Sequence, residues 1–319
     1  MGKYILKRLV QMIPILIGVS LAVYLLLSFS PGDPARMIAG QQAKEEEVEA
    51  LRHELGLDKN VIAQYVGYVG KALRGDLGTS YTTKQKVSDM IAVRLPNTLI
   101  LSLGSIFCIT IVIIPLGISL AVHQNSLFDN AFRVIGLIFA AMPAFWLGLL
   151  MIILFSVKLG WLPPNGFDTW QSRIMPIICS SVVGWMLQSR LVRASMLDVI
   201  RQDYIRTARA KGTEEKKVIR KHALKNALMP MVTSIGMSLG TIFGGSMIIE
   251  VVFGINGMGR MMMDALRQKD IPTVMAGVII TAIAIAFANL LTDIVYAFVD
   301  PRIKSMYEKP RKITKGVKA

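Results

Sequence analysis

Two acidic residues, Glu250 and Asp293, lie within long apolar stretches of the 319-residue sequence. A charged side chain at membrane depth is costly, so each is a candidate for a functional role. Glu250 lies near the end of its stretch, and we favour an acid at the membrane surface over a role in transport. For Asp293 we favour a structural ion pair with a basic residue such as Arg190 or Arg193 over a position on a transport path.

The residues that most often carry catalysis or bind metals form no recognisable pattern. His53, His123 and His222 are far apart in the sequence, and Cys108 and Cys179 lie in apolar stretches, as is typical of small buried side chains. The nucleotide-binding motif G-x-x-x-x-G-K-[ST] is absent. We therefore predict that the chain is not an enzyme, with no catalytic residue, no metal site and no cofactor of its own.

The apolar residues occur in blocks long enough to cross a membrane. Hydrophobic residues make up 53% of the chain and charged residues 18%, and a run of about twenty apolar residues spans a bilayer core. This pattern excludes a soluble globular enzyme and a disordered chain. It predicts an all-α polytopic membrane protein with six transmembrane helices, at about 9–29, 97–122, 131–157, 174–192, 229–253 and 273–299.

Two of these spans have particular features. The first apolar run is longer than that of a secretory signal peptide and no A-x-A-like site follows it, so we expect it to remain uncleaved. Pro143 interrupts the third span, where we expect a kink or a tilt.

The net charge of +15 is concentrated in particular segments. Residues 190–225 hold eleven Lys or Arg against four Asp or Glu, the tail 301–319 holds seven against one, and 31–94 is balanced at nine against nine. The positive-inside rule then places both termini and the loop 193–228 in the cytoplasm, near anionic membrane lipid. These charges flank spans and lack interleaved aromatic residues, so we expect no nucleic-acid partner.

Four regions follow from these predictions. Residues 1–30 hold the N-terminus and the first span, and 31–94 form an extracytoplasmic helical insertion. Within it, apolar residues at helical spacing precede Gly56, and a second amphipathic helix fits 61–74. Residues 95–300 form the transmembrane core, and 301–319 a basic cytoplasmic tail.

The loop between the fourth and fifth spans has the pattern of two helices joined at a glycine. Gly212 is expected to end the first helix, and Thr213 to cap a second helix with Glu214 and Glu215 in its first turn, together covering about 204–225. The candidate contact residues are Arg206, Thr207, Ala208, Arg209, Ala210, Lys211, Gly212, Thr213 and Glu214. The alternative is an ordinary basic loop that only sets membrane topology.

A second candidate feature is the row Gly236, Gly240 and Gly244 in the fifth span, because small residues let helix backbones approach closely. Static packing inside the chain is the favoured interpretation. The alternatives are contact with a partner subunit and a pore-lining face.

The stretch Arg206-Thr-Ala-Arg-Ala-Lys-Gly212, followed by His222-Ala-Leu-Lys-Asn-Ala-Leu-Met-Pro230, resembles the cytoplasmic loop of permease subunits in bacterial ATP-binding-cassette (ABC) importers. The chain is similar, more narrowly, to the first permease subunit of the dipeptide, oligopeptide and nickel importers. Other matching stretches lie at 30–35, 55–58, 75–80, 94–99 and 300–304. The chain has Thr207-Ala208-Arg209 where many importer permeases have Glu-Ala-Ala.

The resemblance implies that the loop is the coupling helix, seated on a separate ATPase subunit. It also implies a second homologous permease, two ATPase subunits that hold ATP and Mg, an extracytoplasmic substrate-binding protein, and a bacterial inner-membrane location. The expected cargo is a di- or oligopeptide, with a nickel complex as the alternative. Residues 254–260 are then an outer gate, a docking surface for the binding protein, or a plain turn. A secondary transporter driven by ions is the rival of another class, but no inverted repeat supports it.

Overall fold

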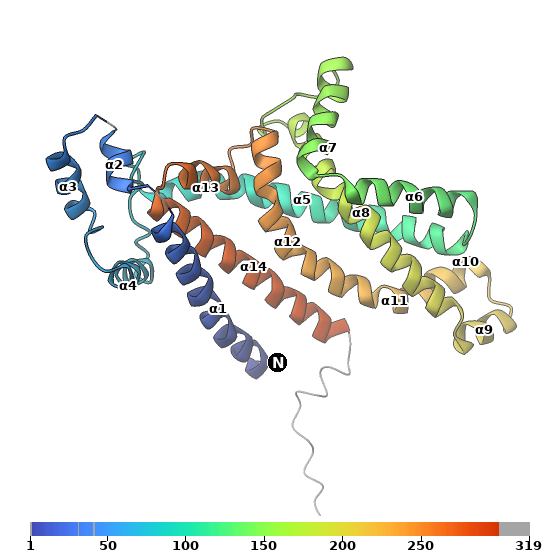
Figure 1. Ribbon diagram of the computed structural model, residues 1–319. Helices are drawn as coiled ribbons and strands as arrows, with labels where there is room; N and C mark the ends of the chain where they lie inside the picture. The colour runs from blue at the N-terminus through green and yellow to red at the C-terminus, as the bar shows by residue number, and fades with distance from the viewer. Residues whose placement is uncertain (1, 31, 41, 300–319) are drawn as a thin grey trace, which may run out of the picture.

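The computed structural model describes residues 2–30, 32–40 and 42–299, apart from the side chains at 2–4, 7, 233, 237, 239, 241–245 and 295–299. The predicted basic tail, 301–319, lies outside the described residues. Within them the chain is helical and contains no strand. Five long helices form the bundle: α1 (Gly2–Phe29), α5 (Val87–Val122), α8 (Trp170–Ile200), α12 (Met229–Val252) and α14 (Ile271–Val299). They lie roughly lengthwise beside one another (Figure 1), with the most extensive packing between α5 and α8 and between α12 and α14.

The long helices coincide with the predicted spans. Four of them, over Arg8–Phe29, Val87–Val122, Trp170–Ile200 and Ile271–Ile294, are long and apolar enough to cross a membrane, and a bent helix pair adds a fifth. Helix α12 occupies the fifth predicted span, although part of its side chains lie outside the described residues. The predicted all-α polytopic fold is thus confirmed.

The third span is broken rather than kinked. It consists of α6 (Leu127–Ala141), α7 (Ala144–Met151) and a π-helical turn, η1 (Ile152–Lys158), with a bend of 105° at the break. Met142 is extended, with ψ 130°, because the ring of Pro143 disfavours helical backbone in the residue before it. Helix α6 lies along α8 (Figure 1), and α7 packs against α8 and α12, with Leu147 and Met151 buried in a core cluster.

Two helices extend beyond the apolar segments that predicted them. Helix α5 begins ten residues before 97, and α8 continues to Ile200 instead of ending near 192. The added turns hold polar residues such as Asp89, Arg94 and Asp198. The apolar residues indicate only the part of a helix that lies within the membrane. The helix itself can continue beyond that part, because its backbone hydrogen bonds do not require apolar side chains.

The insertion between the first two spans contains α2 (Pro34–Ala39), α3 (Glu45–Glu54) and α4 (Val61–Ala72). The two predicted helices are confirmed, and Gly56 follows α3 with φ +69°. Helix α2 was not predicted, although its signal is in the sequence: Asp33 accepts a hydrogen bond from the Ala35 amide at 3.0 Å, and Pro34 begins the helix.

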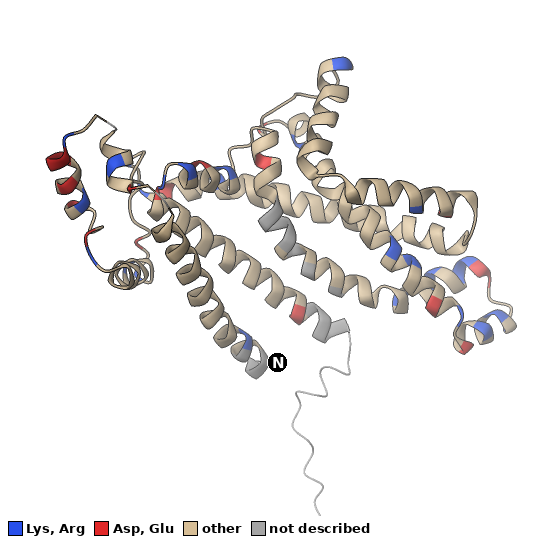
Figure 2. Ribbon diagram, in the orientation of Figure 1, with Lys and Arg blue, Asp and Glu red and all other residues tan. Residues whose placement is uncertain are grey.

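The insertion is joined to the bundle at the start of α14. Buried Asp270 accepts hydrogen bonds from the Tyr81 amide at 3.0 Å and the Thr273 hydroxyl at 2.8 Å, and also from the Ser80 hydroxyl. Figure 2 shows charged residues gathered at two ends of the molecule, over α2 and α3 and over α9 and α10, with long uncharged stretches of helix between them. This distribution suits a bundle that crosses a membrane.

Candidate functional site

The loop between α8 and α12 folds as two helical arms joined at a sharp bend. We call it the bent segment, residues 203–227: α9 (Asp203–Ala210), α10 (Glu215–Lys217), a π-helical stretch η2 (Val218–Ala223) and α11 (Leu224–Ala227). The Gly212 amide donates to the Arg209 carbonyl at 2.9 Å, and the Thr213 amide donates to the Ala208 carbonyl at 3.3 Å. These two bonds form a Schellman motif. Gly212 has φ +75°, so the predicted end of the first helix is confirmed.

The second arm begins one residue later than predicted. Glu214, not Thr213, is at the N-cap, and its side chain makes no capping hydrogen bond. The bend is instead closed by Arg209, which donates to the two carboxylate oxygens of Glu215 at 3.0 and 2.6 Å. That hydrogen bonding lowers the pKa of Glu215 and raises the pKa of Arg209, so both groups are charged at neutral pH.

The underside of the bent segment is part of the hydrophobic core. Ile205 of α9 and Val218 of η2 are fully buried in one cluster with residues of α5 and α8. The buried members include Ile113, Val192, Met196, Ile205, Val218 and Ala223. Helix α9 is therefore packed into the same core as the adjoining ends of α5 and α8.

The outer side of the bent segment faces away from the bundle. Most of the predicted contact residues are exposed, namely Arg206, Thr207, Arg209, Ala210, Lys211, Gly212 and Glu214. Ala208 and Thr213 are half-buried, and Ala208 packs against the core cluster. The same short helix therefore presents a polar, basic surface outward and an apolar anchor inward.

Glu250 is fully buried within the protein. Its depth relative to the membrane surface stays a prediction. Its carboxylate accepts hydrogen bonds from the Thr98 hydroxyl at 2.7 Å and the Arg260 amide at 2.9 Å. A Cβ at Gly257 would lie 2.4 Å from the carboxyl carbon, and one at Gly259 would lie 3.0 Å from a carboxylate oxygen. Glycines at these positions let the backbone close around the acid.

Glu250 thereby holds a helix that the sequence did not predict. Helix α13 (Met258–Arg267) begins beside this side chain, which accepts the hydrogen bond of the Arg260 amide in the first turn of the helix. Its apolar side, with Met258, Met261 and Ala265, is buried. The glycine-rich stretch 254–260 is thus the anchored start of a helix, and its role as a gate or docking surface stays a prediction.

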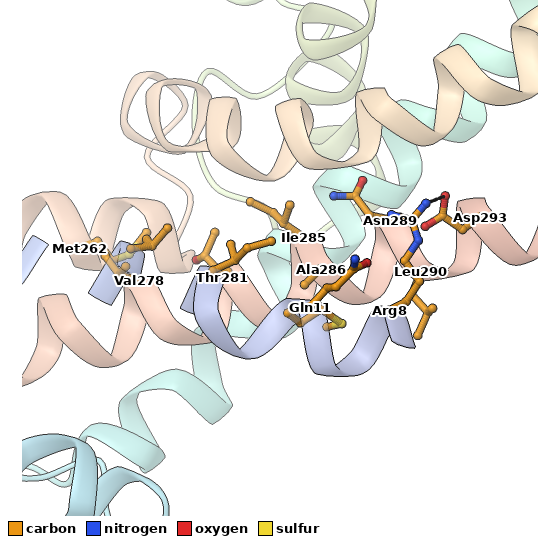
Figure 3. A pocket seen from close by; sticks show the side chains of 14 residues that line it. Arg8, Gln11, Met262, Val278, Thr281, Ile285, Ala286, Asn289, Leu290 and Asp293 are labelled. Carbon is orange, nitrogen blue, oxygen red and sulfur yellow. Dashed lines mark hydrogen bonds and ion pairs between the residues drawn. The ribbon is translucent and has the colours of Figure 1, made fainter. Parts of the chain in front are cut away.

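Asp293 does form an ion pair, but the predicted partners are wrong. It pairs with Arg8 of α1, with 3.1 Å between Nη2 and Oδ1 (Figure 3). Arg190 is exposed. Arg193 binds the fully buried Asp129 of α6 through its Nε and Nη2 atoms at 2.8 and 2.7 Å.

The Arg8–Asp293 pair lies at one end of a groove between α1 and α14 (Figure 3). The groove has a volume of about 640 Å³ and is mainly apolar, with Gln11, Thr281 and Asn289 among its polar lining residues. It follows much of the length of α14.

The first two glycines of the predicted row pack inside the chain. A Cβ at Gly236 would lie 1.8 Å from the Thr292 side chain of α14, and one at Gly240 would lie 3.2 Å from Ile285. This supports static packing between α12 and α14 at both positions. Gly244 is among the positions of α12 whose packing the structure does not describe.

Two polar features of the bundle were missed from the sequence. One is the buried Asp129–Arg193 pair, and the other is a hydrogen bond of 2.8 Å from Gln188 of α8 to the Ser238 hydroxyl of α12. The second feature had a signal in the sequence, because Gln188 lowers the apolarity of the fourth predicted span.

Comparisons with known proteins agree with this architecture. A family described as "Binding-protein-dependent transport system inner membrane component" matches residues 113–305, and the N-terminal part of such membrane components matches residues 1–102. The glutathione transport system permease protein GsiC of Escherichia coli O6:H1 (strain CFT073) is 40% identical over 304 residues, covering 95% of this chain and 99% of GsiC. GsiC of Shigella flexneri serotype 5b (strain 8401) is 39% identical with the same coverage.

A solved structure shares the fold. An inward-facing structure of the MetNI methionine ABC transporter superposes with a TM-score of 0.56 and 23% identity, over 66% of this chain and 96% of that chain. The family match covers more than half of the chain, and GsiC aligns over nearly all of it. The chain therefore belongs to the binding-protein-dependent transport system inner membrane components, and it is a multi-pass permease subunit of an ABC importer rather than an enzyme.

Proposed function

We propose that this permease imports short peptides, with glutathione as the first candidate. The observation that carries the proposal is the 40% identity to glutathione permeases along 95% of the chain. A nickel complex stays the alternative cargo, because the stretches that matched the family are shared by peptide and nickel importers.

We propose further that ATP and Mg are bound by two separate ATPase subunits that dock on the outer side of the bent segment. The sequence lacks a nucleotide-binding motif of its own. The bent segment offers what such docking needs: an exposed face with Arg206, Thr207 and Lys211, and a buried anchor at Ile205. Both termini are then cytoplasmic, on the side of these ATPases.

The remaining partners are a second homologous permease, which completes the translocation path, and a binding protein that delivers the cargo. We place the binding protein at the opposite end of the bundle, near the insertion α2–α4 and α13. Asp270 and Glu250 brace this end, because they fix the insertion and α13 to the transmembrane helices.

Transport proceeds by alternating access in this proposal. Closure of the ATPase pair pushes α9, and the core cluster around Ile205 and Val218 carries the displacement into α5 and α8. The helices then move as rigid bodies, and the cavity opens toward the binding protein.

The test is a reconstituted complex of this permease with its co-expressed partner subunits and binding protein. ATP hydrolysis is measured with glutathione, with a mixed pool of short peptides, and with nickel plus chelators. We expect glutathione or the peptides to stimulate ATP hydrolysis. Stimulation by nickel alone would show that the cargo is a nickel complex, and the proposed transport mechanism would still stand. Ion-driven uptake by this chain alone, without an associated ATPase, would refute the proposal.

A further inference from the structure

A second cavity, of about 380 Å³, lies between α8 and α12 near the middle of both helices. It has polar lining residues from both, including Ser180 and Gln188 of α8 and Ser234 and Ser238 of α12. No charged side chain is among the lining residues that the structure describes. Polar groups at the middle of a membrane-spanning bundle are unfavourable unless they are paired or serve a function.

Gln188, which lines this cavity, has an unused hydrogen-bond acceptor. Its side chain is only 6% exposed, and its Nε2 donates to the Ser238 hydroxyl at 2.8 Å. That hydroxyl donates in turn to the Ser234 carbonyl at 2.8 Å, so it must accept from Gln188, which fixes the orientation of the amide. Among the residues that the structure describes, neither the buried Gln188 Oε1 atom nor the buried Ser180 hydroxyl oxygen has a hydrogen-bond partner.

These unused groups match the chemistry of a peptide bond. The amide oxygen of Gln188 can accept from a backbone N–H, and the Ser180 hydroxyl can donate to a backbone carbonyl. The two residues are eight positions apart on α8, about 12 Å along the helix axis, which is roughly the length of three or four extended residues. The absence of charged lining groups fits a site that reads the backbone and ignores the side chains of its ligand.

The cavity also lies where the bent segment can change its width. Val192 and Met196, one and two turns beyond Gln188 on α8, belong to the core cluster that contains Ile205. The bent segment directly connects α8 to α12. A displacement of α9 therefore acts on both walls of the cavity, and the Gln188–Ser238 hydrogen bond crosses between those walls.

We infer that this cavity is a subsite of the translocation path that binds the peptide backbone of the cargo through Gln188 and Ser180. The inference rests on the proposed function, because it takes the cargo to be a peptide. It adds the chemical group that is recognised and the residues that recognise it.

The experiment compares uptake of trialanine with uptake of trialanine methylated at both amide nitrogens, in proteoliposomes that hold the complete complex and its binding protein. Gln188→Met keeps the side-chain size but removes the acceptor. The loss of the Gln188–Ser238 hydrogen bond affects both peptides alike. Gln188→Met should therefore lower trialanine uptake per ATP by about three- to tenfold more than uptake of the methylated peptide, the value of one neutral hydrogen bond. The matched control is Ser189→Ala, because Ser189 is the next residue on α8, is fully buried and does not line the cavity.

A second measurement reports binding without the binding protein. Leu187 lines the cavity and is 52% exposed, so a thiol introduced by Leu187→Cys, in a Cys108→Ala and Cys179→Ala background, can react with a maleimide. Trialanine should slow this reaction at least threefold. Adding Gln188→Met should abolish the protection, whereas Ser189→Ala should preserve it.

The possible failures are distinguishable. If the wild-type complex takes up trialanine but Gln188→Met behaves like wild type, or lowers uptake of both peptides equally, the subsite is refuted and the proposed function stands. If the wild-type complex responds to nickel and to no peptide, the proposed function falls, and the assignment of a peptide ligand falls with it.

Discussion

Replacing Gly212 should uncouple transport from ATP hydrolysis in a graded order set by backbone conformation. The residue has φ +75°, and nothing in the chain lies within 4 Å of the position that a Cβ would take. An alanine there would thus meet no clash inside the subunit, but it would carry the strain of a left-handed conformation, about 1–2 kcal/mol. That strain lowers the equilibrium constant of the bent conformer by about five- to thirtyfold.

Asparagine at this position separates the effect of backbone strain from that of steric contact with an ATPase subunit. It tolerates the left-handed conformation better than alanine, yet it is larger. If the backbone decides, the number of peptides transported per ATP should fall in the order Gly212, Gly212→Asn, Gly212→Ala, Gly212→Val. If steric contact with an ATPase subunit determines the loss of coupling instead, Gly212→Ala should lower the ratio less than Gly212→Asn.

The assay is the ratio of peptide uptake to ATP hydrolysis in proteoliposomes. Arg206→Ala perturbs the proposed docking face and leaves the Schellman motif intact, because Arg206 is 77% exposed and lies outside that motif. The reasoning from φ is refuted if Gly212→Ala couples as well as or better than Gly212→Asn.

Three further perturbations test other parts of the structure. Arg193→Ala removes two hydrogen bonds to the buried carboxylate of Asp129 and leaves Arg133 as its ion-pair partner, so it should destabilise the permease by about 1.5–3 kcal/mol. Thermal unfolding in detergent measures this, with exposed Arg190→Ala as the control, and equal melting temperatures would contradict it. Gly236→Ala places a Cβ against α14 and should cost about 1–3 kcal/mol, so an unchanged melting temperature would mean that the helices separate freely there. The hydrogen bond from Arg209 lowers the pKa of Glu215, so their ion pair persists at neutral pH and is lost as pH falls through that lowered pKa. The ratio of uptake to hydrolysis in the wild-type complex should therefore fall only in acid. A similar loss in acid for Glu215→Gln would show that another group titrates.

Structural features that depend only on neighbouring residues could be predicted from the sequence. Glycine at a helix end is such a feature, and Gly56 and Gly212 both have positive φ where the predicted helices stop. The break at Pro143 was also placed correctly. Its angle of 105° could not be predicted, because the direction of α7 depends on the neighbouring helices rather than on the proline alone.

Features that depend on distant residues were not predictable. Asp293 finds its partner 285 positions away at Arg8, although basic residues nearer in the chain were the expected choice. The sequence places Glu250 near the end of its span, but it does not show that α13 packs over this side chain. The cavity beside Gln188 could not be predicted, because the serines that line it lie on another turn of α8 and on α12.

The pairing of Arg8 with Asp293 has a consequence for how the protein is made. Helix α1 is synthesised well before α14, against which it packs most extensively. Arg8 therefore lacks this aspartate while the helices between α1 and α14 are made. Arrival of α14 joins two helices that are far apart in the chain, so this contact forms only after the intervening helices have been synthesised.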